Sequence, residues 1–179
     1  MGVREVFSDE EWQRVKELPS DAAMLVITTG GGLIQMTKEL AATARAIVAG
    51  KDSTDELVAA VAADLMDHDK SDKPVKPEGV KTPEQAHAYF LDRIQRAFDV
   101  VTQKAPQHRT AYGDFVLALS HKVAEAAKEG FGGPLVSDAE KAALADIEAV
   151  VASSTTTDEP SNSNASTGGA AADASSNGE

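Results

Sequence analysis

The chain has 179 residues, 42% of them hydrophobic, which suits one globular domain with a single core. Aromatic residues make up only 4% whereas alanine is frequent, and this composition favours closely packed helices over a sheet. Seventeen Lys and Arg against 29 Asp and Glu give a formal charge of -12, so the average surface repels phosphate backbones and anionic headgroups. We therefore expect neither a nucleic acid nor a membrane surface as a partner.

The absence of cysteine removes disulfides, thiolate metal ligands and cysteine nucleophiles from consideration. Residues 1–12 lack the apolar segment of a signal peptide. The longest strongly apolar run, Met24–Ile27, is far shorter than the roughly 20 residues that span a bilayer. These features predict a cytoplasmic protein without a membrane-spanning helix.

The first predicted helix begins with a capping box at Ser8–Glu11, in which a serine caps the helix and a glutamate reaches back to the cap. Phe7 and Trp12 have the spacing of a hydrophobic staple, which would pack their rings across the first turn. Pro19 is expected to end this helix, because the residue before a proline disfavours helical geometry. A second helix is then expected over 22–29, where a strand would find no partner strand.

Three glycines at 30–32 separate this segment from a predicted helix over 33–48, which Gly50 ends. Apolar residues in that helix recur at spacings of three and four, which predicts its buried face. The residues predicted to be buried are Leu33, Met36, Leu40, Ala44 and Ile47. A further helix is expected after Ser53–Glu56, followed by a proline-containing loop over 70–81. Its buried stripe is predicted to be Leu57, Val61 and Leu65.

A cap, a proline and an acid at Thr82–Glu84 predict the start of a long helix that breaks at Pro106. Its predicted buried stripe is Ala86, Phe90, Ile94, Ala97 or Phe98, and Val101. Another helix is expected from 107 to 128. Its apolar positions are Tyr112, Val116, Leu119, Val123 and Ala126. We interpret Gly113 inside this helix as a place where another helix can approach closely.

After a glycine-rich turn at 130–134, a second capping box at Ser137–Glu140 predicts the last helix. When Ser137–Glu140 is aligned with Ser8–Glu11, the acids and the following apolar positions superpose. The alignment fits an internal duplication, and it equally fits two amphipathic helices that share a capping box.

From about residue 153 the chain has no aromatic residue, Leu, Ile, Val, Lys or Arg, and it cannot bury enough apolar surface to offset its ordering entropy. Residues 153–179 are therefore predicted to form a disordered acidic tail rich in Ser, Thr, Asn, Gly and Ala. The fold predicted for residues 5–152 is all-α, a single compact bundle of six or seven amphipathic helices.

Metal-ligating residue types occur in two places. Asp138 and Glu140 lie in the first turn of the last helix, and His121 and Glu125 lie at i and i+4 on one helix face. The His121–Glu125 pair is compatible with a metal pair, an acid–base pair or a plain surface hydrogen bond. Acids at Asp64–Asp69 are a further candidate for cation binding. No phosphate-loop or nucleophile-elbow motif is present, and no catalytic residue is predicted.

Two stretches, Phe7–Trp12 and Val123–Gly130 through Val136–Leu144, resemble a family of small, uncharacterised bacterial all-helical proteins. The resemblance implies one helical domain over residues 5–152. The turn before Ser137–Glu140 and the helix after it are also similar to one half of TerB-like tellurite-resistance proteins. That family is all-helical and associated with metal binding and stress response.

Three classes of function follow from the sequence. The leading hypothesis is a non-catalytic cytoplasmic helical protein that acts through protein–protein contacts, either with a partner or by self-association. It requires no cofactor. One alternative is a TerB-like protein that binds a divalent cation in a stress response. The other is a small-ligand carrier or an enzyme whose site is assembled from distant residues, which predicts a sizeable pocket with converging polar groups.

Overall fold

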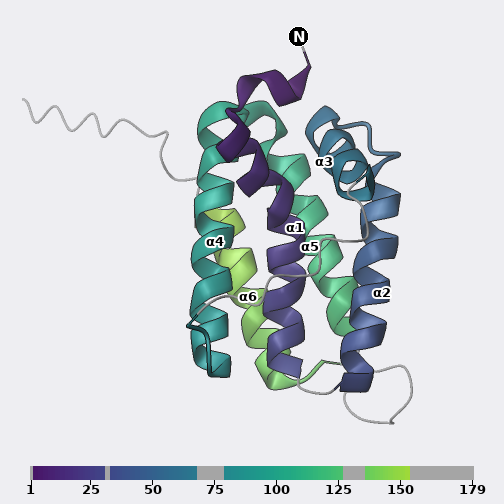
Figure 1. Ribbon diagram of the computed structural model, residues 1–179, viewed down its shortest axis with the longest axis vertical. Coiled ribbons are helices and arrows are strands. Elements are labelled where there is room, and N and C mark those ends of the chain that lie inside the picture. The colour runs from purple at the N-terminus through teal and green to yellow at the C-terminus, as the bar shows by residue number, and fades with distance from the viewer. Residues whose placement is uncertain (1, 31–32, 68–78, 127–135, 154–179) are drawn as a thin grey trace, which may run out of the picture.

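The computed structural model describes residues 2–30, 33–67, 79–126 and 136–153, and every regular element in these ranges is helical (Figure 1). The α-helices are α1 (Asp9–Gly30), α2 (Leu33–Gly50), α3 (Glu56–Asp67), α4 (Pro83–Lys104), α5 (Arg109–Ala126) and α6 (Asp138–Ser153), with 3-10 helices η1 (Val3–Val6) and η2 (Pro106–His108). The predicted all-α bundle is confirmed, with six α-helices in the described residues.

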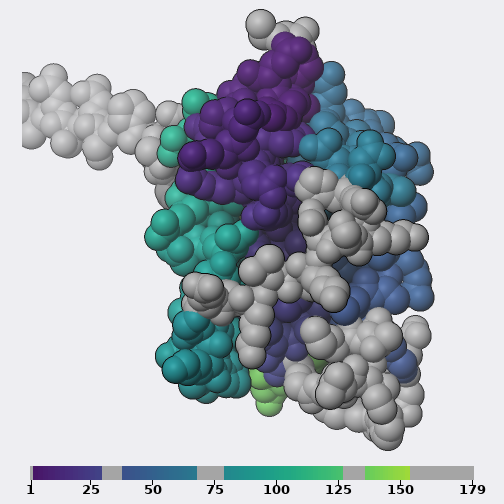
Figure 2. Space-filling model, in the orientation of Figure 1, coloured from purple at the N-terminus to yellow at the C-terminus, as the bar shows by residue number. Residues whose placement is uncertain are grey.

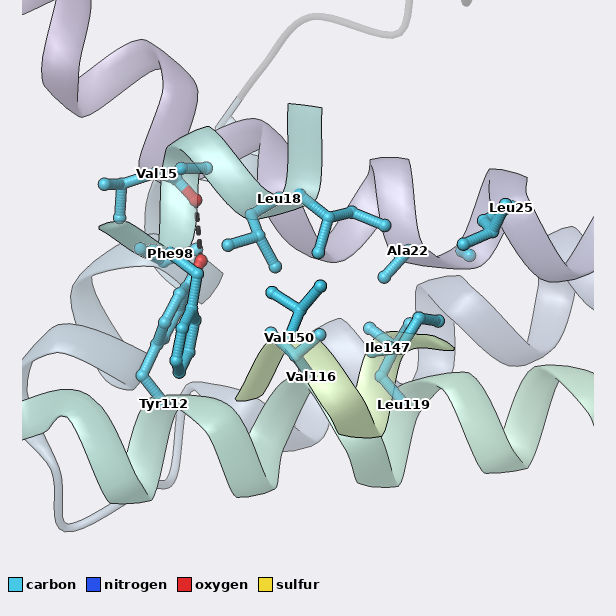
Figure 3. Packing of buried hydrophobic residues seen from close by; sticks show 14 of the residues in the cluster. Val15, Leu18, Ala22, Leu25, Phe98, Tyr112, Val116, Leu119, Ile147 and Val150 are labelled. Atoms are coloured by element: carbon cyan, nitrogen blue, oxygen red, sulfur yellow. Dashed lines mark hydrogen bonds between the residues drawn. The ribbon is translucent and has the colours of Figure 1, made fainter. Parts of the chain in front are cut away.

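Helix α1 lies at the centre of the bundle, with α4 on one side and α2 on the other, and α5 and α6 lie behind it (Figure 1). The core forms where the apolar faces of α1, α4, α5 and α6 meet (Figure 3). Its fully or almost fully buried side chains include Val15, Leu18, Ala22 and Leu25 of α1, Phe98 of α4, Tyr112, Val116 and Leu119 of α5, and Ile147 and Val150 of α6.

Helix α1 continues through Pro19, so the prediction that one helix ends there and a second begins is wrong. Proline has no N–H, and the carbonyl of Val15, four residues earlier, therefore loses its donor within the helix. Tyr112 of α5 replaces that donor, because its hydroxyl donates to the Val15 carbonyl oxygen at 2.6 Å (Figure 3). Leu18 and Ala22, on either side of the proline, are both buried in the core. Contacts with other helices thus stabilise α1 as one continuous helix, although proline by itself disfavours the helix interior.

The helix caps predicted at Ser8, Thr82 and Ser137 are confirmed. Ser8 Oγ accepts from the Glu11 N–H at 3.2 Å, and the Glu11 carboxylate accepts from the Ser8 N–H at 2.8 Å. The rings of Phe7 and Trp12 lie 5.8 Å apart between centroids, as a staple requires. A third capping box, at Thr82, starts α4. These local signals fix where the helices begin.

The predicted buried stripe of α4 is confirmed in full, and that of α3 is confirmed at Leu57 and Val61. In α2 the prediction is wrong at Leu40 and Ala44, which are exposed, whereas Ile47 is partly buried and packs against the core. The side chains of Leu33 and Met36 lie outside the described residues. The inward face of α2 instead carries Glu39, Ala42, Thr43 and Ala46.

Close packing against α5 sets the rotation of α2. A Cβ atom on Gly50, at the end of α2, would lie 2.8 Å from Cε2 of Phe115 of α5, so the two helices touch there. The interpretation of Gly113 is supported in the same way. A Cβ atom on Gly113 would lie 2.7 Å from Cγ1 of Val151 and 3.3 Å from Cζ of Phe98.

Several predictions concern residues outside the described ranges: most of the loop at 70–81, the turn at 130–134, and the tail beyond Ser153. Among the described residues, no helix is long and apolar enough to cross a membrane.

Candidate functional site

The outward face of α2 carries an uncovered apolar stripe. Leu40 is 41% exposed and Val48 is 50% exposed, and Ala44 between them is exposed as well. Their spacing of four places all three on one side of the helix. We call Leu40, Ala44 and Val48 the α2 stripe. Helix α2 lies at the right-hand edge of the bundle, with α3 next to its upper end and α1 and α5 on its inner side (Figure 1). Part of its blue surface is visible at the same edge in Figure 2.

The charges beside the α2 stripe are basic. Arg45 and Lys51 are exposed, and neither forms an ion pair with a carboxylate among the residues that the structure describes. The exposed side chains described within α2 include no acid, and the exposed Asp52 lies beyond the end of the helix. In a chain with 29 acids and 17 bases, this surface departs from the average charge. The stripe therefore combines exposed apolar groups with positive charge.

The inward face of α2 carries a buried acid that sequence reasoning missed. Glu39 is 1% exposed, and within the described part of the chain its Oε1 has no hydrogen-bond partner. Burial, together with repulsion from Glu140, raises the pKa of Glu39 to about 7. The Thr43 hydroxyl donates to the backbone carbonyl of Glu39 at 2.9 Å and not to the Glu39 carboxyl group. No sequence signal distinguishes Glu39 from a surface acid. The apolar pattern predicted that the face containing Leu40 is buried, and Glu39 was not part of that face.

Glu140, predicted as a metal candidate, is the buried acid that interacts with Glu39. It is 2% exposed and lies in the first turn of α6. Both the N–H and the hydroxyl of Ser137 donate to Glu140 Oε2 at 2.7 Å, and the Glu140 N–H donates to Ser137 Oγ at 3.2 Å. An acid in this position also interacts favourably with the helix dipole. The cap therefore fixes the Glu140 carboxylate at the N-terminus of α6.

The other predicted candidates lie on the surface. Asp138 is exposed and pairs with Lys141, whose Nζ lies 3.0 Å from its Oδ1. His121 Nε2 lies 3.4 Å from Glu148 Oε1, so the nearby acid is on α6 and is not the predicted partner Glu125 of α5. Glu125 is exposed on α5. Among the described residues, no group of three or more histidines and acids has a geometry that could hold a metal ion.

A partly buried ion-pair cluster joins α1 to α4. Arg93 Nε donates to Asp21 Oδ2 at 2.8 Å, and Arg93 Nη2 donates to Glu17 Oε2 at 2.5 Å. Burial raises the pKa of Asp21 to about 6, against the opposing effect of Arg93. A small cleft of about 140 Å³ adjoins the cluster. It is lined by Arg14, Asp21, Asp92, Arg93 and Arg96. Since Arg93 already serves two carboxylates, we assign this cluster a structural role between the two helices.

A second hollow lies between α4 and α6. It has a volume of about 530 Å³ and is open to solvent along its length. Leu91 and Val150 lie within it, and its acids are already paired, Asp92 with Arg96 and Asp146 with His87, each at 3.0 Å. The hollow is thus a shallow surface trough and does not enclose a small ligand with converging polar groups.

The described residues define an all-α bundle with one uncovered apolar stripe on α2 and two buried carboxyl groups, those of Glu39 and Glu140. Comparison with protein-family models, with curated proteins and with solved structures found no match for this chain. A functional proposal therefore rests on the geometry of the described residues.

Proposed function

We propose that the protein acts through a protein–protein contact made by the α2 stripe, and that the occupant is an acidic amphipathic helix of another protein. The observation that carries this proposal is the exposure of Leu40, Ala44 and Val48 on one face of a helix whose described, exposed side chains include no acid. Exposed apolar surface of this kind is stabilised when a partner covers it.

The spacing of the α2 stripe suits a helical partner. Residues four apart form a ridge along the helix, and such ridges pack into the grooves of a second helix. Ala44 has a small side chain at the middle of the stripe, so a partner helix can approach closely there, with Leu40 and Val48 contacting it on either side. The docking mode resembles other complexes in which an amphipathic helix lays its apolar face on an apolar surface.

Charge favours an acidic partner over a second copy of this chain. Arg45 and Lys51 beside the stripe would attract carboxylates. Two copies would place like-charged Arg45 side chains near each other, and each copy carries a formal charge of -12. Both effects oppose self-association through this face and favour a partner whose helix presents acids beside its apolar residues.

The test uses two synthetic helical peptides that share one apolar stripe and differ only in their flanking charges, glutamate in one and lysine in the other. We expect the acidic peptide to bind the full chain about tenfold or more tightly than its lysine twin, measured by fluorescence anisotropy at low salt. Val48→Asp should abolish binding of the acidic peptide, because it places a charge in the apolar contact.

The matched control is Met66→Asp. Met66 is 44% exposed on α3, so this variant also adds a surface charge at an exposed apolar residue, but away from the stripe. It should bind as the parent does. Equal binding of the two peptides, or equal losses in the two variants, would refute the proposal. A dimer that sedimentation detects and that Val48→Asp dissociates would instead identify a second copy as the occupant.

A further inference from the structure

We propose that the small cleft between α1 and α4 binds a phosphomonoester group, which Arg14, Arg93 and Arg96 hold together. The cleft has a volume of about 140 Å³, and every residue that lines it is charged. One of the three arginines comes from α1 and two come from α4, and these helices lie side by side (Figure 1). The site is separate from the proposed protein contact, because α2 lies on the other side of α1 from α4 (Figure 1).

Arg93 is held in a fixed orientation by two carboxylates of α1. Its Nε donates to Asp21 Oδ2 at 2.8 Å and its Nη2 donates to Glu17 Oε2 at 2.5 Å. Its guanidinium carbon also lies 5.6 Å from the centre of the Tyr89 ring. Because a guanidinium is planar, these contacts also fix the direction of Nη1, which has no hydrogen-bond partner within the described residues. One donor of the site is therefore oriented before a ligand binds.

Arg14 and Arg96 line the same cleft and have weaker partners. Arg14 Nη2 lies 3.7 Å from Glu10 Oε2, and Arg96 Nε donates to Asp92 Oδ1 at 3.0 Å. In both pairs the acid lies four residues earlier on the same helix, and both arginine side chains are more than half exposed. Exposed pairs of this kind contribute little to stability. The two guanidinium groups can therefore turn toward an anion in the cleft at small cost.

The charges of the cleft favour an anion with more than one negative charge. Its lining has three positive charges against the two negative charges of Asp21 and Asp92, in a chain whose formal charge is -12. A carboxylate ligand would offer no more charge than the acids that are already there. A phosphomonoester carries a charge of about -1.5 to -2 at pH 7 and three acceptor oxygens. It can therefore replace Asp92 at Arg96 and still accept hydrogen bonds from Arg14 and Arg93.

The size of the cleft limits what it can enclose. Pockets for drug-sized ligands measure about 300–1,000 Å³, more than twice the volume found here. The cleft therefore accommodates a terminal phosphate group, and the remainder of the ligand would lie outside it. A small phosphate ester and a phosphorylated protein side chain present the same group, so both are sources that the experiment has to distinguish.

The experiment is an NMR titration of the full chain with methyl phosphate, and with acetate for comparison, at pH 7 and constant ionic strength. We expect saturable shifts of the Nε–H signals of Arg93 and Arg96 with methyl phosphate, and at least about tenfold weaker binding of acetate. Arg14→Gln and Arg96→Gln should each weaken methyl phosphate binding by roughly tenfold, because each removes a charged donor. Arg93 is left unaltered, since its ion pairs join α1 to α4.

Two control variants match the charge changes. Arg45→Gln removes an exposed arginine from α2 and should bind methyl phosphate as the parent does. Asp92→Asn removes the carboxylate that competes for Arg96 and should tighten binding several-fold. Asp114→Asn removes an exposed acid from α5 and should leave binding unchanged. Circular dichroism establishes that each variant is folded.

The proposal is overturned if methyl phosphate gives no saturable shifts at Arg93 and Arg96, or if Arg14→Gln and Arg96→Gln bind as the parent does. It is also overturned if Arg45→Gln loses as much affinity as they do, or if Asp92→Asn does not tighten binding. None of these outcomes involves the α2 stripe, so they leave the proposed protein contact untouched.

A phosphoserine peptide and its unphosphorylated twin distinguish the two sources. Tighter binding of the phosphoserine peptide than of methyl phosphate, with no binding of the twin, would identify a phosphorylated side chain as the ligand. Equal or weaker binding of the peptide would identify a small phosphate ester.

Discussion

Helices α4 and α2 both carry apolar residues at spacings of three and four, yet the pattern predicts the buried face of one and misplaces that of the other. Every residue of the predicted α4 stripe is buried. In α2, Leu40 and Ala44 face solvent and Glu39 faces the interior. The comparison shows that periodicity locates a buried face only when the other faces of the helix are clearly polar.

The two sequences differ in that respect. Helix α4 places charged residues such as Asp92, Arg93 and Arg96 between its apolar positions, so one face stands out. The segment 38–50 of α2 has alanine or a larger apolar residue at most positions, and several rotations would bury a similar area. Contacts with the neighbouring helices, such as that of Gly50 with Phe115 of α5, therefore determine which face of α2 is buried.

The largest effect that this comparison predicts is at the centre of α4. Phe98 is fully buried, and Phe98→Ala should lower the free energy of unfolding by about 3–5 kcal/mol because it removes a large core side chain and leaves a cavity. Chemical denaturation measures the change. Tyr89→Ala, at an exposed aromatic of the same helix, is the control and should cost much less. Similar losses in the two variants would contradict the assigned inward face of α4.

The next effect is the pH dependence that Glu39 confers on α2. Burial raises the pKa of Glu39 to about 7 in the folded protein, whereas in the unfolded chain the group has its ordinary pKa of 4.5. The free energy of unfolding should therefore fall as pH rises through that window, by about 1–3 kcal/mol. Glu39→Gln should remove this part of the slope and be more stable than the parent at about pH 8.

Thermal or urea unfolding at a series of pH values measures that slope. Glu125→Gln, at an exposed acid, should keep the slope of the parent. Asp21 contributes a slope of the same sign, because its pKa is also raised, from 3.8 to about 6. Part of the decline therefore persists in both variants. An unchanged slope in Glu39→Gln would mean that Glu39 is not buried in solution.

A third prediction extends the comparison to α1, where a neighbour again overrides a local signal. Tyr112→Phe leaves the buried Val15 carbonyl without a donor and should cost about 1–2 kcal/mol. In a Pro19→Ala background, residue 19 regains an N–H that can serve Val15, so the same substitution should cost less. The double-mutant cycle measures this difference, and an equal cost in both backgrounds would show that Tyr112 does not compensate for the proline.

The smallest effect is expected on the outward face of α2. Leu40→Ala should change the free energy of unfolding by no more than about 0.5 kcal/mol, because its side chain is largely exposed. The same denaturation experiment as for Phe98→Ala gives a direct comparison of the two helices. A loss of several kcal/mol would mean that the predicted inward face of α2 was right after all.

The starts of α1, α4 and α6 were determined by the sequence alone, since the groups that satisfy a cap lie within four residues of each other. The capping boxes at Ser8 and Ser137 form as predicted, and so does the staple between Phe7 and Trp12. The cap predicted at Thr82 also forms, and Gln85 completes it as a capping box. The all-α class, the buried stripe of α4 and the close approach at Gly113 could also be read from local pattern.

Tertiary structure alone decided the continuity of α1, the rotation of α2 and the burial of Glu39 and Glu140. The sequence placed Glu140 among the metal candidates but gave no reason to expect its side chain, or that of Glu39, to be buried. Each of these outcomes depends on a group supplied by another helix, and a local pattern has no access to that group. The α2 stripe, which we propose to carry function, arises from this rotation.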